Sequence, residues 1–202
     1  TLKFGGDFSD TYFNIANALC DQGKLDEAIV CYRQVLQMYP YDIDIYNNLG
    51  IVLQSQGRLE EAAGCFSKIL QIKPDNAKAH YNLGMIMQWQ DKPEEAIDHF
   101  HQALKANPND ANSYFKLGVI VQSQGRLDEA IGHYSKAIHI RPVFPEAHNN
   151  LAMLLAQQGK LDEAIQHYRQ VLASKPDDAS AHNNLATAFM ALAGRLDEAV
   201  SQ

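Results

Sequence analysis

Tyr46-Asn47-Asn48-Leu49-Gly50 is the key to the fold, because related five-residue stretches return along the sequence every 34 residues. The related stretches begin at residues 12, 80, 114, 148 and 182. A strict period of this length is typical of a stacked repeat array, in which each repeat contacts only its neighbours. Function in such an array is expected on a surface that successive repeats build together.

The period makes the whole chain one elongated domain. Five full repeats are predicted, at 9–42, 43–76, 77–110, 111–144 and 145–178. A partial sixth repeat at 179–202 is expected to stop inside its second helix. Residues 1–8 align with the ends of the repeats, with Gly6 where the others have proline, and are predicted to be the tail of a preceding repeat.

Each repeat has the pattern of two helices. In the second repeat Tyr46, Leu49 and Leu53 share helical spacing, Gly57 interrupts the pattern, and a second apolar series follows from residue 59 to 70. Carboxylates directly after the interruption suit the first turn of a helix, where the helix dipole favours negative charge. Prolines close the second helices, and the Asp or Asn that often follows can cap the next helix. The chain is therefore predicted to be all-α.

This succession of an aromatic residue or His, then Leu-Gly or Leu-Ala, then Ala, then Tyr or Phe, and finally Pro resembles the tetratricopeptide repeat. The resemblance covers residues 9–202. It implies an α-α superhelix, a right-handed solenoid of antiparallel helix pairs whose first helices line a concave groove that holds peptide segments of partner proteins. The sixth repeat departs from the pattern, because its turn, within residues 190–199, carries one extra residue.

Bulk composition excludes several classes of partner. Seventeen Lys and Arg against 24 Asp and Glu give a net charge of −7, which disfavours binding to nucleic acid. No apolar run approaches the roughly 20 residues needed to cross a bilayer, so no membrane partner is expected. The three cysteines, Cys20, Cys31 and Cys65, lack CxxC spacing, which argues against disulfides and a zinc site and fits a reducing, cytoplasmic location.

The face of each first helix opposite its packed stripe carries two recurring kinds of side chain. Amides recur at Asn14, Asn48, Asn82, Asn150 and Asn184, and apolar side chains at Ile51, Met85, Val119 and Met153. Trp89 lies on the same face, where a large amphipathic ring can anchor an interface. Because Asn offers both donors and an acceptor, a row of amides can hydrogen-bond the backbone of an extended peptide. These ten residues form the predicted peptide-binding groove.

The same face is also compatible with roles that need no ligand. Asn recurs equally well if the repeats arose by duplication, or if the amides bond between adjacent helices. Trp89 can equally cover a neighbouring helix. Phe13, Tyr81 and Phe115 are predicted at the edge of the groove, shared between helix packing and ligand contact.

The row of amides resembles the asparagine ladder in the tetratricopeptide superhelix of O-linked N-acetylglucosamine transferases and, to a lesser degree, that of kinesin light chains. The resemblance implies that the five amides hold the backbone of a bound protein. Lys116 interrupts the row in the fourth repeat. No catalytic domain is recognised in residues 1–202, so any glycosyl transfer would belong to sequence after Gln202.

A second binding mode of the family is the carboxylate clamp for C-terminal tails. Asn17, Asn48 and Lys78 match its pattern. Phe13 and Asn82 stand where the pattern has Lys and Arg, so the charge-assisted part of the clamp is missing and this mode is disfavoured.

The sequence predicts neither an enzyme nor a cofactor or metal site. Residues at equivalent places in successive repeats lie about 10 Å apart, too far for two imidazoles to share an ion. One such series of equivalent residues consists of Cys31, Cys65, His99, His133 and His167. No paired carboxylates, nucleophile with a base, or Gly-rich phosphate loop is recognised.

The predicted function is a protein-protein interaction scaffold that binds extended peptide segments of its partners, as the recognition arm of a larger protein. The alternative is a structural array or filament, a homo-oligomer built by head-to-tail stacking of uncapped repeats.

Overall fold

The computed structural model describes the backbone of residues 5–200 and the side chains of residues 11–194. The backbone forms helices joined by short turns, and strands are absent from this part of the chain. The all-α fold class predicted from the period is therefore confirmed. Two compact units divide between Ala106 and Asn107.

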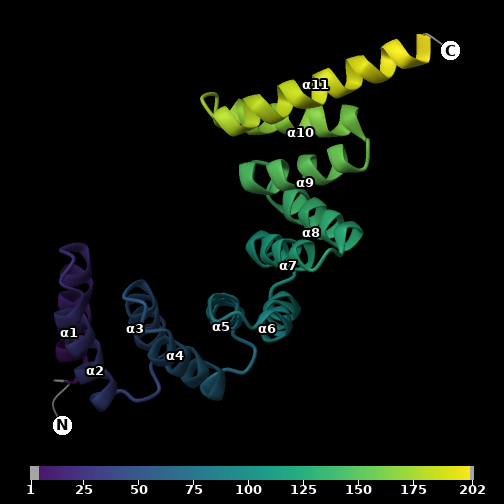
Figure 1. The fold of residues 1–202 in the computed structure, drawn as a ribbon. Coiled ribbons are helices and arrows are strands. Elements are labelled where there is room, and N and C mark those ends of the chain that lie inside the picture. Colours follow the sequence, from purple (N-terminus) through teal and green to yellow (C-terminus); the bar gives the residue numbers. More distant parts are fainter. Residues whose placement is uncertain (1–4, 201–202) are drawn as a thin grey trace. The chain divides into compact units, whose positions relative to one another are not determined.

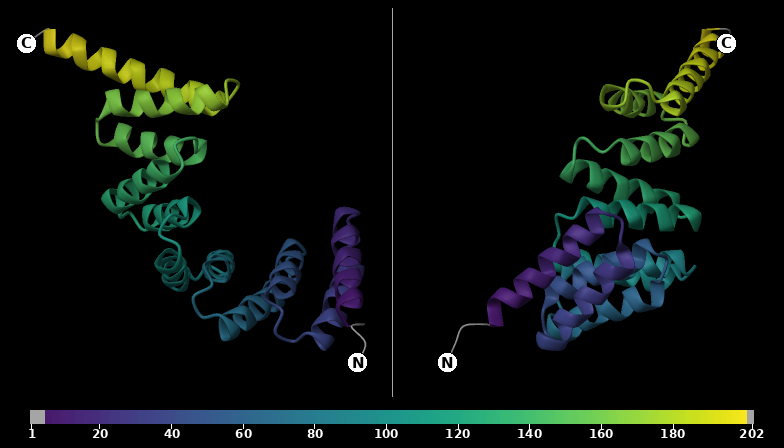
Figure 2. Two further views of the ribbon diagram at one scale, coloured as in Figure 1. Left: turned by 180° about the vertical axis from the view of Figure 1, so that it is seen from behind. Right: turned by 90° about the vertical axis from the view of Figure 1, so that its left-hand side faces the viewer.

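The first unit contains three helix pairs. Their helices are α1 (Gly5–Asp21), α2 (Leu25–Met38), α3 (Ile43–Ser55), α4 (Leu59–Ile72), α5 (Ala77–Trp89) and α6 (Pro93–Ala106). Each helix packs against the next one along the chain. Figures 1 and 2 show this succession of hairpins, with the labels of the helices in Figure 1.

The second unit contains α7 (Ala111–Ser123), α8 (Leu127–Ile140), α9 (Pro145–Gln157), α10 (Leu161–Ser174) and α11 (Ala179–Val200). The first four form two hairpins, and α11 packs on α10 and touches α9. Figure 1 shows α11 as one long helix beside α10. Between Gly5 and Val200, none of the helices has both the length and the apolar character that crossing a membrane requires.

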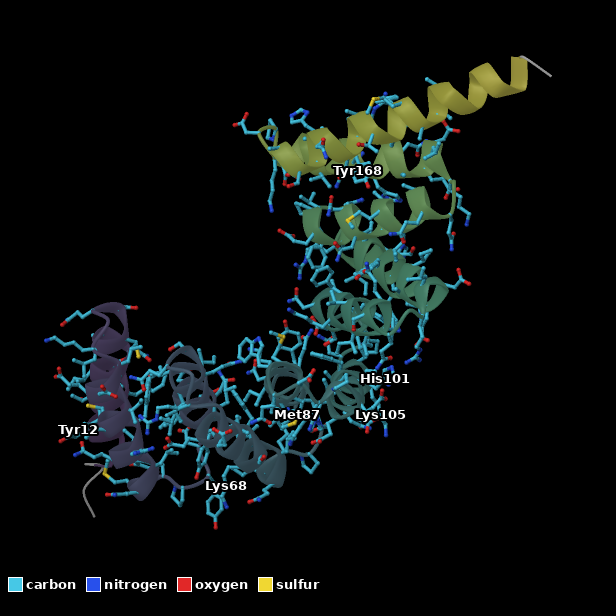
Figure 3. All side chains as sticks on the ribbon, in the orientation of Figure 1. Tyr12, Lys68, Met87, His101, Lys105 and Tyr168 are labelled. Atoms are coloured by element: carbon cyan, nitrogen blue, oxygen red, sulfur yellow. The ribbon has the colours of Figure 1, made fainter. Side chains whose placement is uncertain are left out.

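Small residues on the first helices allow aromatic rings from the second helices to fill the hairpins. Phe66 is fully buried beside Gly50, where a Cβ atom would lie 2.7 Å from the ring carbon Cζ. The same close approach joins Gly84 to Phe100 and Gly118 to Tyr134. Partly buried side chains such as those of Tyr12 and Met87, both labelled in Figure 3, pack around the core of the first unit.

Turn chemistry follows the sequence pattern. Gly57 has a φ of 74°, in the left-handed region that glycine adopts without a steric penalty. Asp91 occupies the equivalent place in the third repeat with a φ of 57°, and α6 begins two residues later at Pro93. Asp42 caps α3 by accepting from the backbone N–H groups of Asp44 and Ile45.

Two predicted breaks are absent. Residues 5–8, expected to end a preceding repeat, form the start of α1; residues 1–4 lie outside the described residues. Gly6 keeps its N–H and has no ring, so it does not stop a helix as proline does. The prediction of a turn within residues 190–199 is wrong as well, because α11 runs unbroken through Gly194. The run of Ala, Leu and Met before Gly194 consists of strong helix formers.

Candidate functional site

The predicted groove residues fall into two sets, one in each unit. The first unit holds Asn14, Asn48, Asn82, Ile51, Met85 and Trp89, and the second holds Asn150, Asn184, Val119 and Met153. All ten stand on first helices of their repeats or on α11. Each unit therefore carries its own part of the predicted groove.

In the first unit, α5 carries a strip of three predicted residues. Asn82, Met85 and Trp89 are spaced three and four residues apart and so share one face of the helix. The Trp89 side chain is 53% exposed, and on the neighbouring first helix α3 the Ile51 side chain is 47% exposed. Large apolar surface is therefore open to solvent on this face.

The amides of the first unit differ in their hydrogen bonding. Asn48 Nδ2 donates to Asn17 Oδ1 over 3.5 Å, and the same oxygen accepts from the Tyr32 hydroxyl at 2.6 Å. The side chains of Asn14 and Asn82 make no hydrogen bond to another described residue. Asn14 is exposed and Asn82 partly buried. The Asn48 amide thus bonds between adjacent helices, whereas that of Asn82 keeps its bonding groups available.

In the second unit, Asn150 is tied to the preceding hairpin. Its Nδ2 donates to the Tyr134 hydroxyl over 3.3 Å, and that hydroxyl donates to Gln122 Oε1 at 2.5 Å. Burial raises the pKa of Tyr134 to about 12, so its hydroxyl remains protonated at neutral pH. Asn184 Nδ2 donates to Asn149 Oδ1 at 3.4 Å. Both predicted amides of this unit therefore form hydrogen bonds between helices, which is the alternative to ligand contact.

Lys116, which interrupts the row of amides, is a partly buried cation. Desolvation lowers the pKa of its ammonium group, which lies 5.9 Å from the ring centre of Phe115. Within the described part of the chain it forms no ion pair. The interruption therefore exchanges a neutral amide for a positive charge without an ion-pair partner among the side chains of residues 11–194.

A cavity of about 310 Å³ opens next to Asn150 in the second unit. Glu146, Asn149, Lys175 and Asp178 are among its polar lining residues. Lys175 Nζ lies 2.6 Å from Glu146 Oε1, and this ion pair lowers the pKa of the Glu146 carboxyl. Lys175 and Asp178 are not among the predicted residues, because they follow a second helix and a helical wheel of the first helices does not sample them.

The predicted edge residues are mainly packing residues. The ring centre of Phe115 lies 5.8 Å from that of Tyr134 and 5.0 Å from that of Phe144. Tyr81 and Phe100 have ring centres 5.6 Å apart, and Phe13 packs similarly on Tyr32. Aromatic rings at these distances stabilise the packing of the helices whether or not a ligand is present.

Metal-binding groups are sparse. Among the side chains of residues 11–194, no three His, Cys, Asp or Glu residues gather closely enough to hold one ion. Two pairs of histidines do come together within single hairpins, His80 with His99 and His148 with His167. The wide separation expected between equivalent residues of successive repeats does not apply to them, because the members of each pair stand 19 residues apart within one repeat.

Sequence comparison returns one kind of repeat along the chain. A family model described as "Tetratricopeptide repeat" matches residues 41–106 and 75–142, which together span more than half of the sequence. Another model with this description matches residues 133–166, and one described as "TPR repeat" matches residues 16–57 and 153–192. No curated protein matches the chain.

Solved structures with a similar fold include the MamA protein, at 28% sequence identity and a TM-score of 0.72 over 87% of this chain and 96% of that one. YrrB, described as "a TPR protein with an unusual peptide-binding site", matches at 24% identity and a TM-score of 0.66 over 85% and 89%. PilF of Pseudomonas aeruginosa matches at 19% and 0.77 over 92% and 90%. The last two likenesses support the fold alone.

Proposed function

The chain belongs to the tetratricopeptide repeat family, and we propose that it is a protein-interaction scaffold whose first helices hold an extended peptide segment of a partner. The proposed role is binding rather than catalysis. The asparagine ladder and a cytoplasmic location remain predictions, and the ladder is the finer part of this proposal.

The observation that carries the proposal is the strip on α5. An unbonded amide at Asn82 stands one helical turn from Met85 and two from the half-exposed ring of Trp89. Such a combination suits an extended peptide, because the amide can bond a backbone N–H or C=O group while the apolar side chains bury the neighbouring residue of the partner. Both the amide and the exposed ring are available to a ligand.

The second unit supports the proposal in a modified form. One N–H of the Asn150 amide donates to the Tyr134 hydroxyl, and the second N–H and Oδ1 remain available to a ligand. The cavity beside it adds the ion pair of Glu146 and Lys175. The unpaired ammonium of Lys116 favours a partner segment with an acidic group at the corresponding position, since pairing offsets part of its desolvation.

The proposal is tested with a displayed library of random 12-residue peptides selected on the whole chain. Peptides that bind are expected to lose affinity by about tenfold or more on Asn82→Ala or Trp89→Ala, the size typical of interface anchors. Lys68→Ala is the matched control, because Lys68 is exposed on the second helix α4. Unchanged affinity in both groove variants, with unchanged helicity, overturns the proposal.

Head-to-tail self-assembly is the second candidate, and the exposed apolar face of α11 favours it. The side chains of Phe189 and Met190 are 42% and 68% exposed. If this face joins copies, light scattering should show mass rising with concentration, and Met190→Glu should abolish the rise. A constant monomer mass over a wide concentration range rejects it.

A further inference from the structure

Two histidine pairs occupy equivalent places in different hairpins. His80 on α5 faces His99 on α6, with their Nδ1 atoms 3.2 Å apart. His148 on α9 faces His167 on α10, with their Nδ1 atoms 2.9 Å apart. Each pair joins the first and second helix of one repeat, and each unit contains one pair.

The backbone orients the first histidine of each pair. His80 Nε2 lies 3.0 Å from the carbonyl oxygen of Pro74, and His148 Nε2 lies 2.9 Å from that of Pro142. Because a carbonyl only accepts, Nε2 must carry the proton in both rings. Nδ1 of each neutral ring is then left with its lone pair directed to the partner histidine. A carbonyl bonded to the far nitrogen is also the usual support of a metal-binding histidine.

The spacing of the two nitrogens matches that of two ligands on one ion. Two nitrogens each about 2.0–2.1 Å from a metal are about 2.9 Å apart at a right angle and about 3.4 Å apart at the tetrahedral angle. The observed separations of 3.2 and 2.9 Å fall in this range. We propose that each pair is a two-histidine site for a late first-row divalent ion, Cu²⁺, Ni²⁺ or Zn²⁺, whose remaining positions are filled by water.

Binding requires a change of tautomer at the second histidine and a rotation of both rings, because an ion about 2 Å from each Nδ1 lies off the line that joins the two atoms. Without metal, His99 Nδ1 carries the proton that it donates to His80 Nδ1. With metal, that proton lies on Nε2 of His99 and both Nδ1 lone pairs bind the ion. His167 changes in the same way against His148. At each site a neutral imidazole pair therefore binds the ion without net release of a proton.

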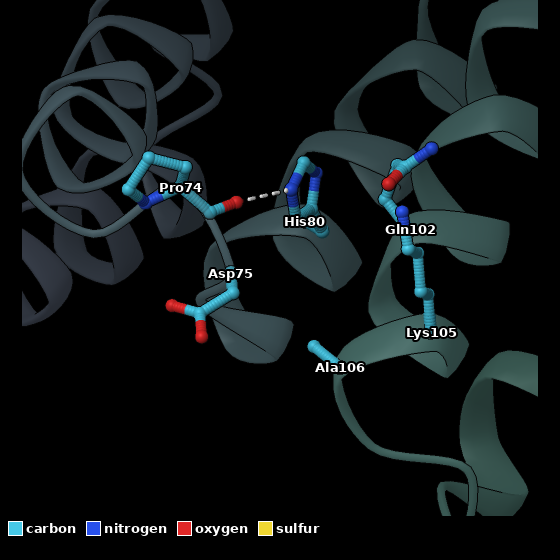
Figure 4. Close-up of a pocket in the computed structure, with 6 residues that line it drawn as sticks. All are labelled: Pro74, Asp75, His80, Gln102, Lys105 and Ala106. Carbon is cyan, nitrogen blue, oxygen red and sulfur yellow. Dashed lines mark hydrogen bonds between the residues drawn. The ribbon is translucent and has the colours of Figure 1, made fainter.

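A cavity opens beside His80 of the first site, and a carboxylate stands one helical turn from His99. His80 lines a cavity of about 480 Å³ together with Asp75, Gln102 and Lys105, and Figure 4 shows its ring between Pro74 and the α6 side chains. Glu95 stands four residues before His99, on the same face of α6. At the second site His148 is only 5% exposed, so the ion enters beside the partly buried His167.

The chain itself provides variants that remove a site without disturbing the hairpin. Tyr46 and Tyr114 hold the places of His80 and His148 in neighbouring repeats. Tyr114 packs on His133 with ring centres 6.2 Å apart, so the hairpin already accommodates a Tyr–His pair. His80→Tyr and His148→Tyr are therefore expected to fold.

The experiment is calorimetric titration of the untagged full chain with CuCl₂, NiCl₂ and ZnCl₂ in a non-coordinating buffer at neutral pH. Two ions per chain are expected, with Cu²⁺ bound most tightly. Each Tyr variant should lose one ion, and His80→Tyr/His148→Tyr should lose both while its helicity stays unchanged. The control His101→Asn/His139→Asn removes exposed histidines, of which Figure 3 labels His101, and should keep both ions.

Full binding by the double Tyr variant, or loss of binding in the control, overturns the proposal. So does a wild-type chain that binds none of the three ions. Copper electron paramagnetic resonance adds an independent check, because two coordinated nitrogens per ion are expected in the wild type and their signal should disappear in the double Tyr variant.

Discussion

The side-chain amide of Asn150 on α9 donates a hydrogen bond of 3.3 Å to the hydroxyl of Tyr134 on α8. Tyr134 is a core residue of the fourth repeat, whereas Asn150 belongs to the predicted groove of the fifth. The bond therefore couples a groove residue to the packing between successive repeats. Asn82 lacks this tie within the described residues, because the preceding repeat has Phe66, without a hydroxyl, in the place of Tyr134.

Asn150→Ala is expected to lower the free energy of unfolding by about 0.5–1.5 kcal/mol, the usual net value of one hydrogen bond. A double-mutant cycle with Tyr134→Phe isolates the pair, because the hydroxyl also bonds Gln122. Asn82→Ala should change stability by less than about 0.5 kcal/mol. Urea denaturation measures all of these, and equal losses at Asn82 and Asn150 would contradict the assignment.

Two glycines of the second repeat should respond to alanine with opposite signs. At Gly50 the added Cβ would lie 2.7 Å from the buried Phe66 ring, so overpacking of about 1–3 kcal/mol exceeds the gain in helix propensity of about 1 kcal/mol. Gly64 in α4 has no atom within 4 Å of that position, and Gly64→Ala should stabilise by about 0.5–1 kcal/mol. Thermal and urea unfolding check the pair; stabilisation by both substitutions would refute the close approach.

The turns between paired helices predict a second contrast. Asp91 has a φ of 57°, a conformation that glycine adopts more easily, so Asp91→Gly should stabilise by about 0.5 kcal/mol. Gly159 has a φ of 75°, and Gly159→Ala should destabilise by about 1 kcal/mol. Gly194→Ala lies inside α11 and should stabilise instead. A loss at Gly194 comparable with that at Gly159 would indicate a turn in place of the continuous helix.

Acid should weaken the fold through the paired histidines. Burial, and after it the charge of the partner histidine, lowers the pKa of His99 and of His167 below the ordinary value of about 6.5. At pH values near and below 6.5, the histidines of the unfolded chain bind more protons than those of the folded chain. The free energy of unfolding should therefore fall as the pH decreases from about 7 to 5. The nearby carboxylates of Asp98, Glu95 and Glu163 oppose the shifts without reversing them.

The control for this pH dependence is His99→Cys/His167→Cys, because Cys31 and Cys65 stand at the equivalent places. Urea unfolding with a metal chelator and a reductant should show a shallower loss of stability in the variant. The same loss in both proteins would assign the acid sensitivity to other groups.

Much of the hairpin architecture follows from the sequence because it depends on local chemistry. Gly57 permits a left-handed turn, Asp42 supplies an oxygen to free N–H groups, and Pro93 fits a first helical turn. The ends of the array are less predictable. The repeat pattern places a turn within residues 190–199, but no proline or left-handed glycine enforces it, and strong helix formers continue α11 through Gly194.

Helical spacing and turn residues act over a few positions, so the linear sequence is enough to assign the period, the helix pairs and the face on which Asn82, Met85 and Trp89 stand. The packing of helices against one another settles which amides are bonded between helices and which histidines meet. Asn150 reaches Tyr134 and His80 reaches His99 because two helices pack closely enough to bring residues 16 and 19 positions apart into contact. A repeat pattern aligns equivalent residues, whereas the hydrogen bonds of Asn150 and His80 form with non-equivalent ones.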